Sequence, residues 1–154
     1  MIKTIAAAGD PAREIFSQRL IDAPRERIFR AYADPQLLAR WWGPEGFRNS
    51  FEEFDFRPGG HWRFVMHGPD GTDYANHNMF LEIEAPARIV IQHQCAPHFS
   101  AHISLDEAQG DKTLLSFRMH FESAAVRDQV AAYAIPANEQ NFDRLQAVLA
   151  TMAP

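Results

Sequence analysis

The stretch from Phe51 to Arg88 constrains the fold more than any other part of the chain. In it an alternating aromatic strand, a Pro-Asp-Gly turn, a second alternating strand and a Glu-Ala-Pro-Ala-Arg turn follow one another without a break. Because side chains alternate between the two faces of a strand, the large residues of this stretch gather on one face. The pattern predicts a curved antiparallel meander whose concave face needs a cover.

Further elements are predicted on both sides of this stretch. A strand over residues 14–21 precedes a helix that we expect Asp22 to cap, and Asp34 and Pro35 begin a second short helix. The remaining strands, separated by turns rich in Pro, Gly and Asp, are expected over residues 48–57, 61–67, 72–84, 88–95, 99–107 and 112–121.

The C-terminal segment supplies the cover for the concave face. Ser123 is expected to cap a short helix over residues 124–134, and Pro136 to begin a separate last helix. We expect that last helix to pack against Phe117 and Met119 of the sheet. Its apolar residues recur at spacings of three and four, which predicts one buried stripe of Phe142, Leu145, Leu149 and Met152.

Composition limits the number of domains and the classes of partner. With 154 residues, 46% of them hydrophobic, the chain suits a single domain over residues 1–154 with a loosely ordered segment at 1–12. A net charge of -5 without a cluster of Lys and Arg argues against nucleic-acid binding. No apolar run reaches the length of a membrane span, and a lone Cys95 permits no internal disulfide, which is typical of a cytoplasmic protein.

Several short motifs occur in an order that resembles one known family. They are Ile21-Asp22-Ala23-Pro24, Trp41-Trp42-Gly43-Pro44, Asp55-Phe56-Arg57-Pro58-Gly59-Gly60, Met66-His67-Gly68-Pro69-Asp70-Gly71 and Phe80-Leu81-Glu82-Ile83-Glu84-Ala85-Pro86-Ala87-Arg88-Ile89-Val90. With them the chain resembles the AHSA-type family, named after the activator of the heat-shock-protein-90 ATPase, within the START-like or SRPBCC superfamily. The resemblance covers nearly all of residues 14–150. It implies an α+β helix-grip fold, in which a curved antiparallel sheet wraps around a long C-terminal helix, with two short helices after the first strand.

The resemblance implies the fold more closely than the function, because its superfamily includes polyketide cyclases, lipid carriers and hormone receptors. Three functions stay open: binding of a small hydrophobic or aromatic molecule in a cavity between the sheet and the last helix, enzymatic action of the cyclase or hydrolase type on a hydrophobic substrate, and partnership with a chaperone. Ligand binding is favoured because no complete catalytic triad, metal site or cofactor loop supports an enzyme. No cofactor or catalytic residue is assigned, and the sequence indicates no oligomeric state.

Alternation along the strands selects the residues expected to contact a ligand. Those expected on the concave face, with one from the last helix, are Trp62, Phe64, Met66, Asn76, Asn78, Phe80, Ile91, His93, Phe99, Phe117, Met119 and Asn141. Trp42 and Asn138 are expected at the rim. The turn at Pro86 should bring Asn78 and His93 side by side in one row with Trp62 and Phe99. The polar pair then either contacts a ligand or only satisfies its own hydrogen bonds in a filled core.

Three further expectations concern titratable groups. A neutral His93 held by Asn78 in apolar surroundings is costly to protonate, so its pKa should fall below the ordinary value of about 6.5. Cys95 should lie about 6 to 7 Å from His93 along the strand, too far for direct proton transfer. Glu82 has the parity of Phe80 and should point inward unless a β-bulge intervenes. The seven histidines show no pair at metal-ligand spacing, so no metal site is expected.

Overall fold

The structure, a computed structural model, describes residues 10–152. In chain order its elements are η1 (Pro11–Arg13), β1 (Glu14–Ile21), α1 (Arg25–Ala33), α2 (Pro35–Trp41), β2 (Arg48–Phe54), β3 (His61–His67), β4 (Asp73–Glu84), β5 (Arg88–His93), β6 (Phe99–Ala108), β7 (Lys112–Phe121) and α3 (Ala124–Thr151). Of the segment expected to be loosely ordered, residues 1–9 lie outside the described residues. Pro11–Arg13 form a 3-10 turn in which the Asp10 carboxylate accepts a hydrogen bond from the Ala12 N–H at 3.0 Å.

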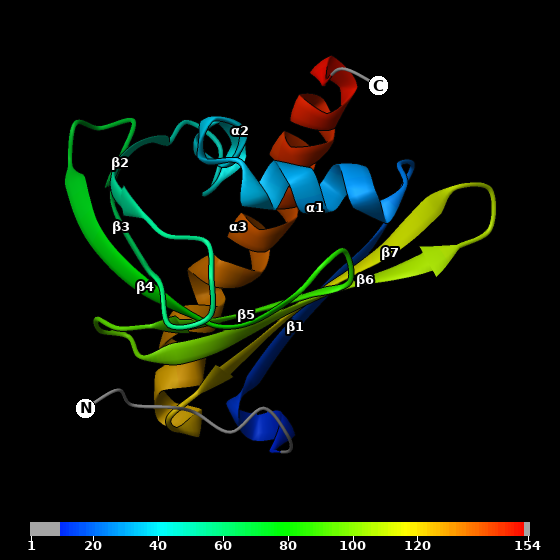
Figure 1. The fold of residues 1–154 in the computed structure, drawn as a ribbon. Helices are drawn as coiled ribbons and strands as arrows, with labels where there is room; N and C mark the ends of the chain where they lie inside the picture. The colour runs from blue at the N-terminus through cyan, green and yellow to red at the C-terminus, as the bar shows by residue number, and fades with distance from the viewer. Residues whose placement is uncertain (1–9, 153–154) are drawn as a thin grey trace.

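The strands form one antiparallel sheet in the order β1-β7-β6-β5-β4-β3-β2. Strands β2 to β7 are each neighbours of the next in sequence, as the short turns predicted, and β1 adds to the outer edge of β7. The sheet curves strongly, and α3 lies across its concave side (Figure 1). This architecture confirms the predicted α+β helix-grip fold.

The strand register also follows the prediction. Cross-strand pairing sets four residues in one row: Trp62, Asn78, His93 and Phe99. A register shift between Phe80 and Glu82 marks a β-bulge. Because of this bulge Glu82 does not follow the inward parity of Phe80, and its carboxylate accepts two hydrogen bonds of 3.1 Å from Arg88.

Of the two short helices after β1, α2 begins with the predicted cap and α1 does not. Asp34 caps α2 by accepting a hydrogen bond from the Gln36 N–H at 2.9 Å, with Pro35 in the first turn, as predicted. The expected cap of α1 by Asp22 is wrong. The chain stays extended through Pro24, which is itself the N-cap and makes no side-chain cap, so Asp22 lies too early to reach the first-turn N–H groups.

The C-terminal segment is one helix and not the two that were expected. Ser123 caps it as predicted, its hydroxyl accepting from the Val126 N–H at 3.2 Å, but α3 then continues through Pro136 to Thr151. Proline lacks an N–H, which leaves the carbonyl of Ala132 without its usual helical donor. Both Ala132 and Pro136 are exposed, so water can hydrogen-bond that carbonyl.

The C-terminal half of α3 fills the core where α1 and α2 cover the sheet (Figure 1). The predicted stripe of Phe142, Leu145, Leu149 and Met152 is buried and belongs to the same core as Phe117 and Met119. Trp41 at the end of α2 is fully buried there, and its indole N–H donates to the Ala31 carbonyl at 3.1 Å. The stripe therefore fixes the depth of α3 against the sheet.

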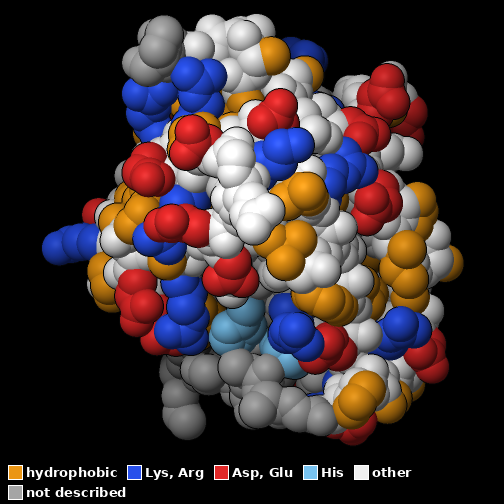
Figure 2. All heavy atoms as spheres, turned by 90° about the vertical axis from the view of Figure 1, so that its right-hand side faces the viewer, with side chains coloured by type: hydrophobic (Ala, Val, Ile, Leu, Met, Phe, Trp, Pro, Cys, Tyr) orange, Lys and Arg blue, Asp and Glu red, His pale blue; other side chains and the backbone are white. Residues whose placement is uncertain are grey.

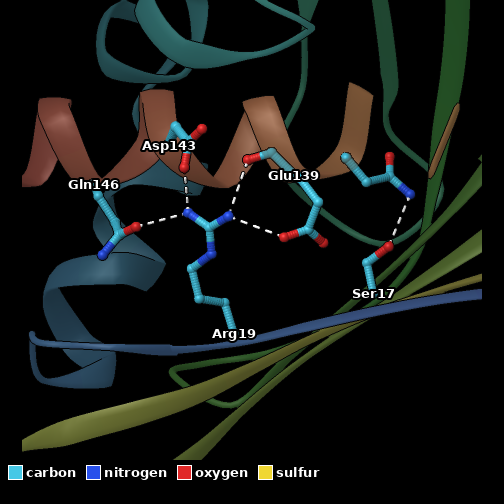
Figure 3. A network of polar contacts seen from close by, with 6 residues as sticks. Ser17, Arg19, Glu139, Asp143 and Gln146 are labelled. Atoms are coloured by element: carbon cyan, nitrogen blue, oxygen red, sulfur yellow. Dashed lines mark hydrogen bonds and ion pairs between the residues drawn. The ribbon is translucent and has the colours of Figure 1, made fainter. Parts of the chain in front are cut away.

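Arg19 of β1 fixes α3 laterally, as Figure 3 shows. Its guanidinium donates to the Gln146 side-chain oxygen at 2.8 Å and to the carboxylates of Asp143 at 2.5 Å and Glu139 at 3.0 Å. The same group lies over the ring of Phe142, 5.3 Å from its centroid. One edge-strand side chain thus contacts two consecutive turns of the helix.

Arg144 holds the opposite side of α3. Its guanidinium donates to five backbone carbonyls in and after α2, at 2.9 to 3.2 Å, those of Arg40, Trp42, Gly43, Pro44 and Phe47. These carbonyls belong to the C-terminal end of a helix and the loop after it, where carbonyl groups lack intrahelical N–H partners. Arg144 therefore fixes the connection from α2 to β2 against α3.

We expect the replacement Leu145→Ala to lower the free energy of unfolding by about 2 to 5 kcal/mol, because it leaves a cavity in the core. Leu145 is 0% exposed, whereas Leu20 on β1 is 52% exposed and provides the matched control. Leu20→Ala should cost less than about 0.5 kcal/mol. Urea unfolding of both variants measures the difference, and equal losses would contradict this placement of α3.

We also expect stability to fall on acidification because of His102. Burial, followed by the neighbouring His120 and Arg88, lowers the pKa of His102 to about 4. Between about pH 6.5 and 4 the unfolded chain binds a proton at this residue and the folded chain does not, so the free energy of unfolding decreases as pH falls through that window. Urea titrations at pH 7 and 5 should show a smaller loss for His102→Gln than for the wild type; an identical loss would be inconsistent with this pKa.

Candidate functional site

A cavity of about 570 Å³ lies between the concave face of the sheet, residues 130–141 of α3 and residues 42–47 of the α2–β2 connection. Its origin is a change in side-chain size along α3. The helix lines the cavity with small residues such as Val130, Ala134 and Ala137, whereas large residues from Phe142 onward fill the core. The N-terminal half of the helix therefore spans the sheet without filling the space between them.

Most residues predicted to surround a ligand line this cavity: Trp42, Phe64, Met66, Asn76, Asn78, Ile91, His93, Phe99, Phe117, Met119, Asn138 and Asn141. Trp62 and Phe80 lie on the expected face but do not line it. The Trp42 ring lies against Trp62, with centroids 5.1 Å apart, and the Phe56 ring lies against Phe80 at the same separation. Side chains from connecting loops therefore cover both residues, which strand alternation does not predict.

Parts of the cavity wall that come from loops and from small residues were not predicted from the sequence. These are Gly43, Pro44, Phe47, Tyr74, Ala75, Cys95, Ala96, Pro97, Val130, Tyr133, Ala134 and Ala137. One available signal was the run of small residues at helical spacing over 130–137, which marks a thin helix face. Tyr74 and Tyr133 are more than 45% exposed and lie at the mouth of the cavity.

His93 is held differently from the prediction. Its Nδ1 lies 2.8 Å from the Pro97 carbonyl and its Nε2 lies 3.1 Å from Oδ1 of Asn76, so Asn76 and not Asn78 is its amide partner. The imidazole stacks on Phe99 with centroids 4.7 Å apart, and its contact with Asn76 runs diagonally across the strands.

The expected direction of the His93 pKa is wrong. Burial is the largest single effect and lowers the pKa of His93, but hydrogen bonds with Cys95 and with the Pro97 carbonyl raise it above its ordinary value in sum. The prediction considered only burial and a neutral amide partner. It omitted acceptors supplied by the loop after β5.

Cys95 lies closer to His93 than strand geometry predicts. Its Sγ is 3.4 Å from Nε2 of His93, within hydrogen-bond reach of a sulfur. The expected separation of about 6 to 7 Å assumed that the strand continues to Cys95. Because β5 ends at His93, the chain turns and brings the thiol back to the imidazole.

Asn78 stands opposite His93 on the neighbouring strand. Its side chain lines the cavity, the residue is only 4% exposed, and no hydrogen bond to its carboxamide is found within residues 10–152. A buried amide normally finds a partner, because leaving it unpaired costs free energy. The interpretation in which Asn78 and His93 satisfy each other is therefore wrong, and the carboxamide is available to a molecule in the cavity.

The amides contributed by α3 have structural partners. Asn141 Oδ1 accepts from the Gly43 N–H at 2.6 Å, and Asn138 donates to the Ser17 hydroxyl at 3.2 Å. Gly43 has φ +97, and a side chain there would collide with Met66. Asn141 and Gly43 thus place Trp42, which forms part of the cavity wall.

A second polar cluster lies on the outer face of the sheet. Nε2 of His67 is 2.7 Å from the Ser50 hydroxyl, and its Nδ1 is 2.7 Å from the Asp73 carboxylate. This order of contacts is that of a serine hydrolase triad. None of the three lines the cavity, and Ser50 and Asp73 are exposed, so we assign the cluster to the polar surface of the sheet.

Other classes of site find little support in the described residues. Within residues 10–152, no three His, Cys, Asp or Glu side chains gather as a metal site would require. On the face shown in Figure 2, Lys and Arg side chains are interspersed with Asp and Glu, so this face carries no basic patch. Among the described helices, none has the length and apolar character needed to cross a membrane.

Comparison with known proteins places the chain in a family. The profile of the family described as Activator of Hsp90 ATPase homolog 1-like protein matches residues 22–150. No curated protein sequence matches the chain.

Solved bacterial structures share the fold. A protein from Nitrosomonas europaea is 20% identical, with a TM-score of 0.85 over 94% of this chain and 99% of its own. One from Arthrobacter aurescens is 25% identical, with a TM-score of 0.84 over 98% and 94%. The AHSA1 protein from Silicibacter pomeroyi is 18% identical, with a TM-score of 0.75 over 90% and 98%. The chain therefore belongs to the Activator of Hsp90 ATPase homolog 1-like protein family.

Proposed function

We propose that the protein binds a small, uncharged hydrophobic or aromatic molecule in the cavity between the sheet and the N-terminal half of α3. The observation that carries this proposal is the carboxamide of Asn78, which has no hydrogen-bond partner among the described residues and lies in a mostly apolar wall. In such sites apolar area supplies affinity and a few polar groups fix orientation. The volume of about 570 Å³ is within the range of small-molecule pockets.

The chemistry of the wall narrows the ligand class. None of its residues is Lys, Arg, Asp or Glu, so no permanently charged side chain in the wall compensates the desolvation of a charged ligand. Phe64, Phe117 and Met119 offer flat and adaptable apolar contacts, and Asn78 offers a donor and an acceptor. A ligand with an apolar body and one carbonyl or hydroxyl group fits these contacts.

The proposal also covers the cellular compartment and the role of the protein. We propose a single-domain cytoplasmic protein acting as a carrier or sensor, for which a free Cys95 is compatible with a reducing compartment. A chaperone contact, which the family's name suggests, would use the exterior and would not need the cavity open. The two functions therefore respond differently to a change that fills the cavity.

We expect Ala137→Trp to abolish most ligand binding while the fold is kept. Ala137 lines the cavity, whereas Ala132 lies on the exposed side of the same helix and makes Ala132→Trp the matched control. Fluorescence titration with N-phenyl-1-naphthylamine, a neutral aromatic probe, should show at least about a tenfold loss of affinity for the first variant and less than about a twofold change for the second.

Circular dichroism and urea unfolding confirm that both variants are folded. If the wild type does not bind the probe, or if both variants bind it equally well, the proposed cavity function fails and the chaperone-partner alternative is favoured.

A further inference from the structure

A thiol and an imidazole meet at the cavity wall where β5 ends. Cys95 and His93 both line the cavity, and Sγ lies 3.4 Å from Nε2. A nucleophile within hydrogen-bond reach of a base, with the base oriented by a third group, is the arrangement of covalent catalysis. The contacts around His93 decide whether its Nε2 can act as that base.

The hydrogen bonds fix the tautomer of His93. The Pro97 carbonyl, 2.8 Å from Nδ1, can only accept, so Nδ1 carries a hydrogen. In the neutral ring Nε2 is therefore the nitrogen with the free lone pair, and it is the one that faces the thiol. Stacking on Phe99 holds the plane of the ring.

Asn76 favours the protonated form of the same nitrogen. Its Nδ2 donates to the Tyr74 carbonyl at 3.0 Å, which orients the amide so that Oδ1 faces Nε2 of His93 at 3.1 Å. An amide oxygen can only accept, so this contact becomes a hydrogen bond once Nε2 has taken up a proton. Asn76 is thus a positioning residue that stabilises the imidazolium.

The directions of the pKa shifts of Cys95 and His93 favour proton transfer from the thiol to the imidazole. The hydrogen bond with His93 is the largest effect and lowers the pKa of Cys95, while the pKa of His93 is raised despite burial. The pKa of the neighbouring His77 is lowered, first because of burial, which disfavours a second positive charge beside the pair. A thiolate is far more nucleophilic than a thiol.

The cavity supplies the means to hold an electrophile against this pair. Asn78 faces His93 across the strands, and cross-strand neighbours have Cβ atoms about 4.5 to 5.5 Å apart. Its unpartnered Nδ2 can donate to a carbonyl oxygen next to the imidazole. Phe64, Phe117 and Met119 provide the apolar surface for the rest of the molecule.

We propose that the cavity takes an α,β-unsaturated carbonyl compound with an apolar body and that Cys95 adds to it, with His93 as the proton carrier. This inference rests on the proposed binding function and specifies its ligand class. Addition suits the site better than acyl transfer, because addition needs no leaving group and only one oxygen to stabilise.

The atoms of the addition balance without a co-reactant. The thiol proton moves to Nε2 of His93, and Sγ forms a bond to the β carbon of the ligand. The π electrons of the double bond move toward the carbonyl oxygen as an enolate, to which Asn78 donates. The proton on Nε2 then passes to the α carbon. One S–C and one C–H bond form, and one S–H and one C–C π bond break.

The test compares the enone 3-nonen-2-one with its saturated analogue 2-nonanone at pH 7. Intact-mass spectrometry follows the adduct, and borohydride reduction of the ketone before digestion stops the reverse reaction, so that peptide mapping locates the site. We expect a single adduct at Cys95, a rate that saturates with enone concentration, and a second-order rate at least about tenfold above that of glutathione.

Variants separate the roles of the residues. Cys95→Ser should give no adduct yet retain affinity for 2-nonanone, measured by displacement of N-phenyl-1-naphthylamine. His93→Gln should slow adduct formation by about tenfold or more, with the 2-nonanone affinity changed less than about threefold. His98→Gln, which alters a histidine outside the cavity wall, should react at the wild-type rate.

The outcomes distinguish the two proposals. If 2-nonanone binds but Cys95 reacts no faster than glutathione, or if His93→Gln reacts as fast as the wild type, the covalent inference is overturned and the binding function stands. If the probe binds but neither ketone displaces it from the wild type, the inferred ligand class is overturned, whereas the binding function is decided by the probe titration of Ala137→Trp and Ala132→Trp.

Discussion

A strongly curved sheet that carries large apolar side chains on its concave face is not stable in water unless that face is covered, and here α3 covers it. The helix is held at three places. Leu145 and its neighbours bury one stripe, Arg19 contacts the side facing β1, and Arg144 binds the carbonyls of the α2–β2 connection. These contacts concentrate in the C-terminal half of α3.

That asymmetry explains the cavity. A helix fixed firmly over one half of its length needs less packing over the other half, and the helix residues that line the inside of the cavity, Val130, Ala134 and Ala137, are small. The well-packed C-terminal half of α3 therefore holds in place the N-terminal half that spans the cavity. Stability and a binding cavity are thus located in different parts of one helix, as expected where function requires incomplete packing.

The framework of the site was predictable from the sequence because local rules govern it. Strand alternation and short turns fix register, so the row containing Asn78 and His93 could be derived before the structure was known. The bulge after Phe80 was foreseen as the condition that turns Glu82 outward. Both inferences depend on backbone geometry, which neighbouring residues determine.

The chemistry of the site was not predictable, because it depends on where a strand ends and on which groups of the following loop contact the strand. Because β5 ends two residues before the expected end of the strand, the chain turns Cys95 toward His93 and gives the imidazole a carbonyl partner from Pro97. Likewise Pro136 did not end the helix, since its position on the exposed side makes the lost hydrogen bond inexpensive. Tertiary context decided each of these cases.

The central claim is that a small apolar molecule enters the space under the N-terminal half of α3. Methyl NMR of methionine-labelled protein tests it directly, because Met66 and Met119 line the cavity whereas Met79 and Met152 are buried elsewhere. Addition of N-phenyl-1-naphthylamine should shift the methyl resonances of Met66 and Met119 and leave those of Met79 and Met152 in place. Shifts confined to Met79 or Met152, or no shifts at saturating probe, would contradict the account.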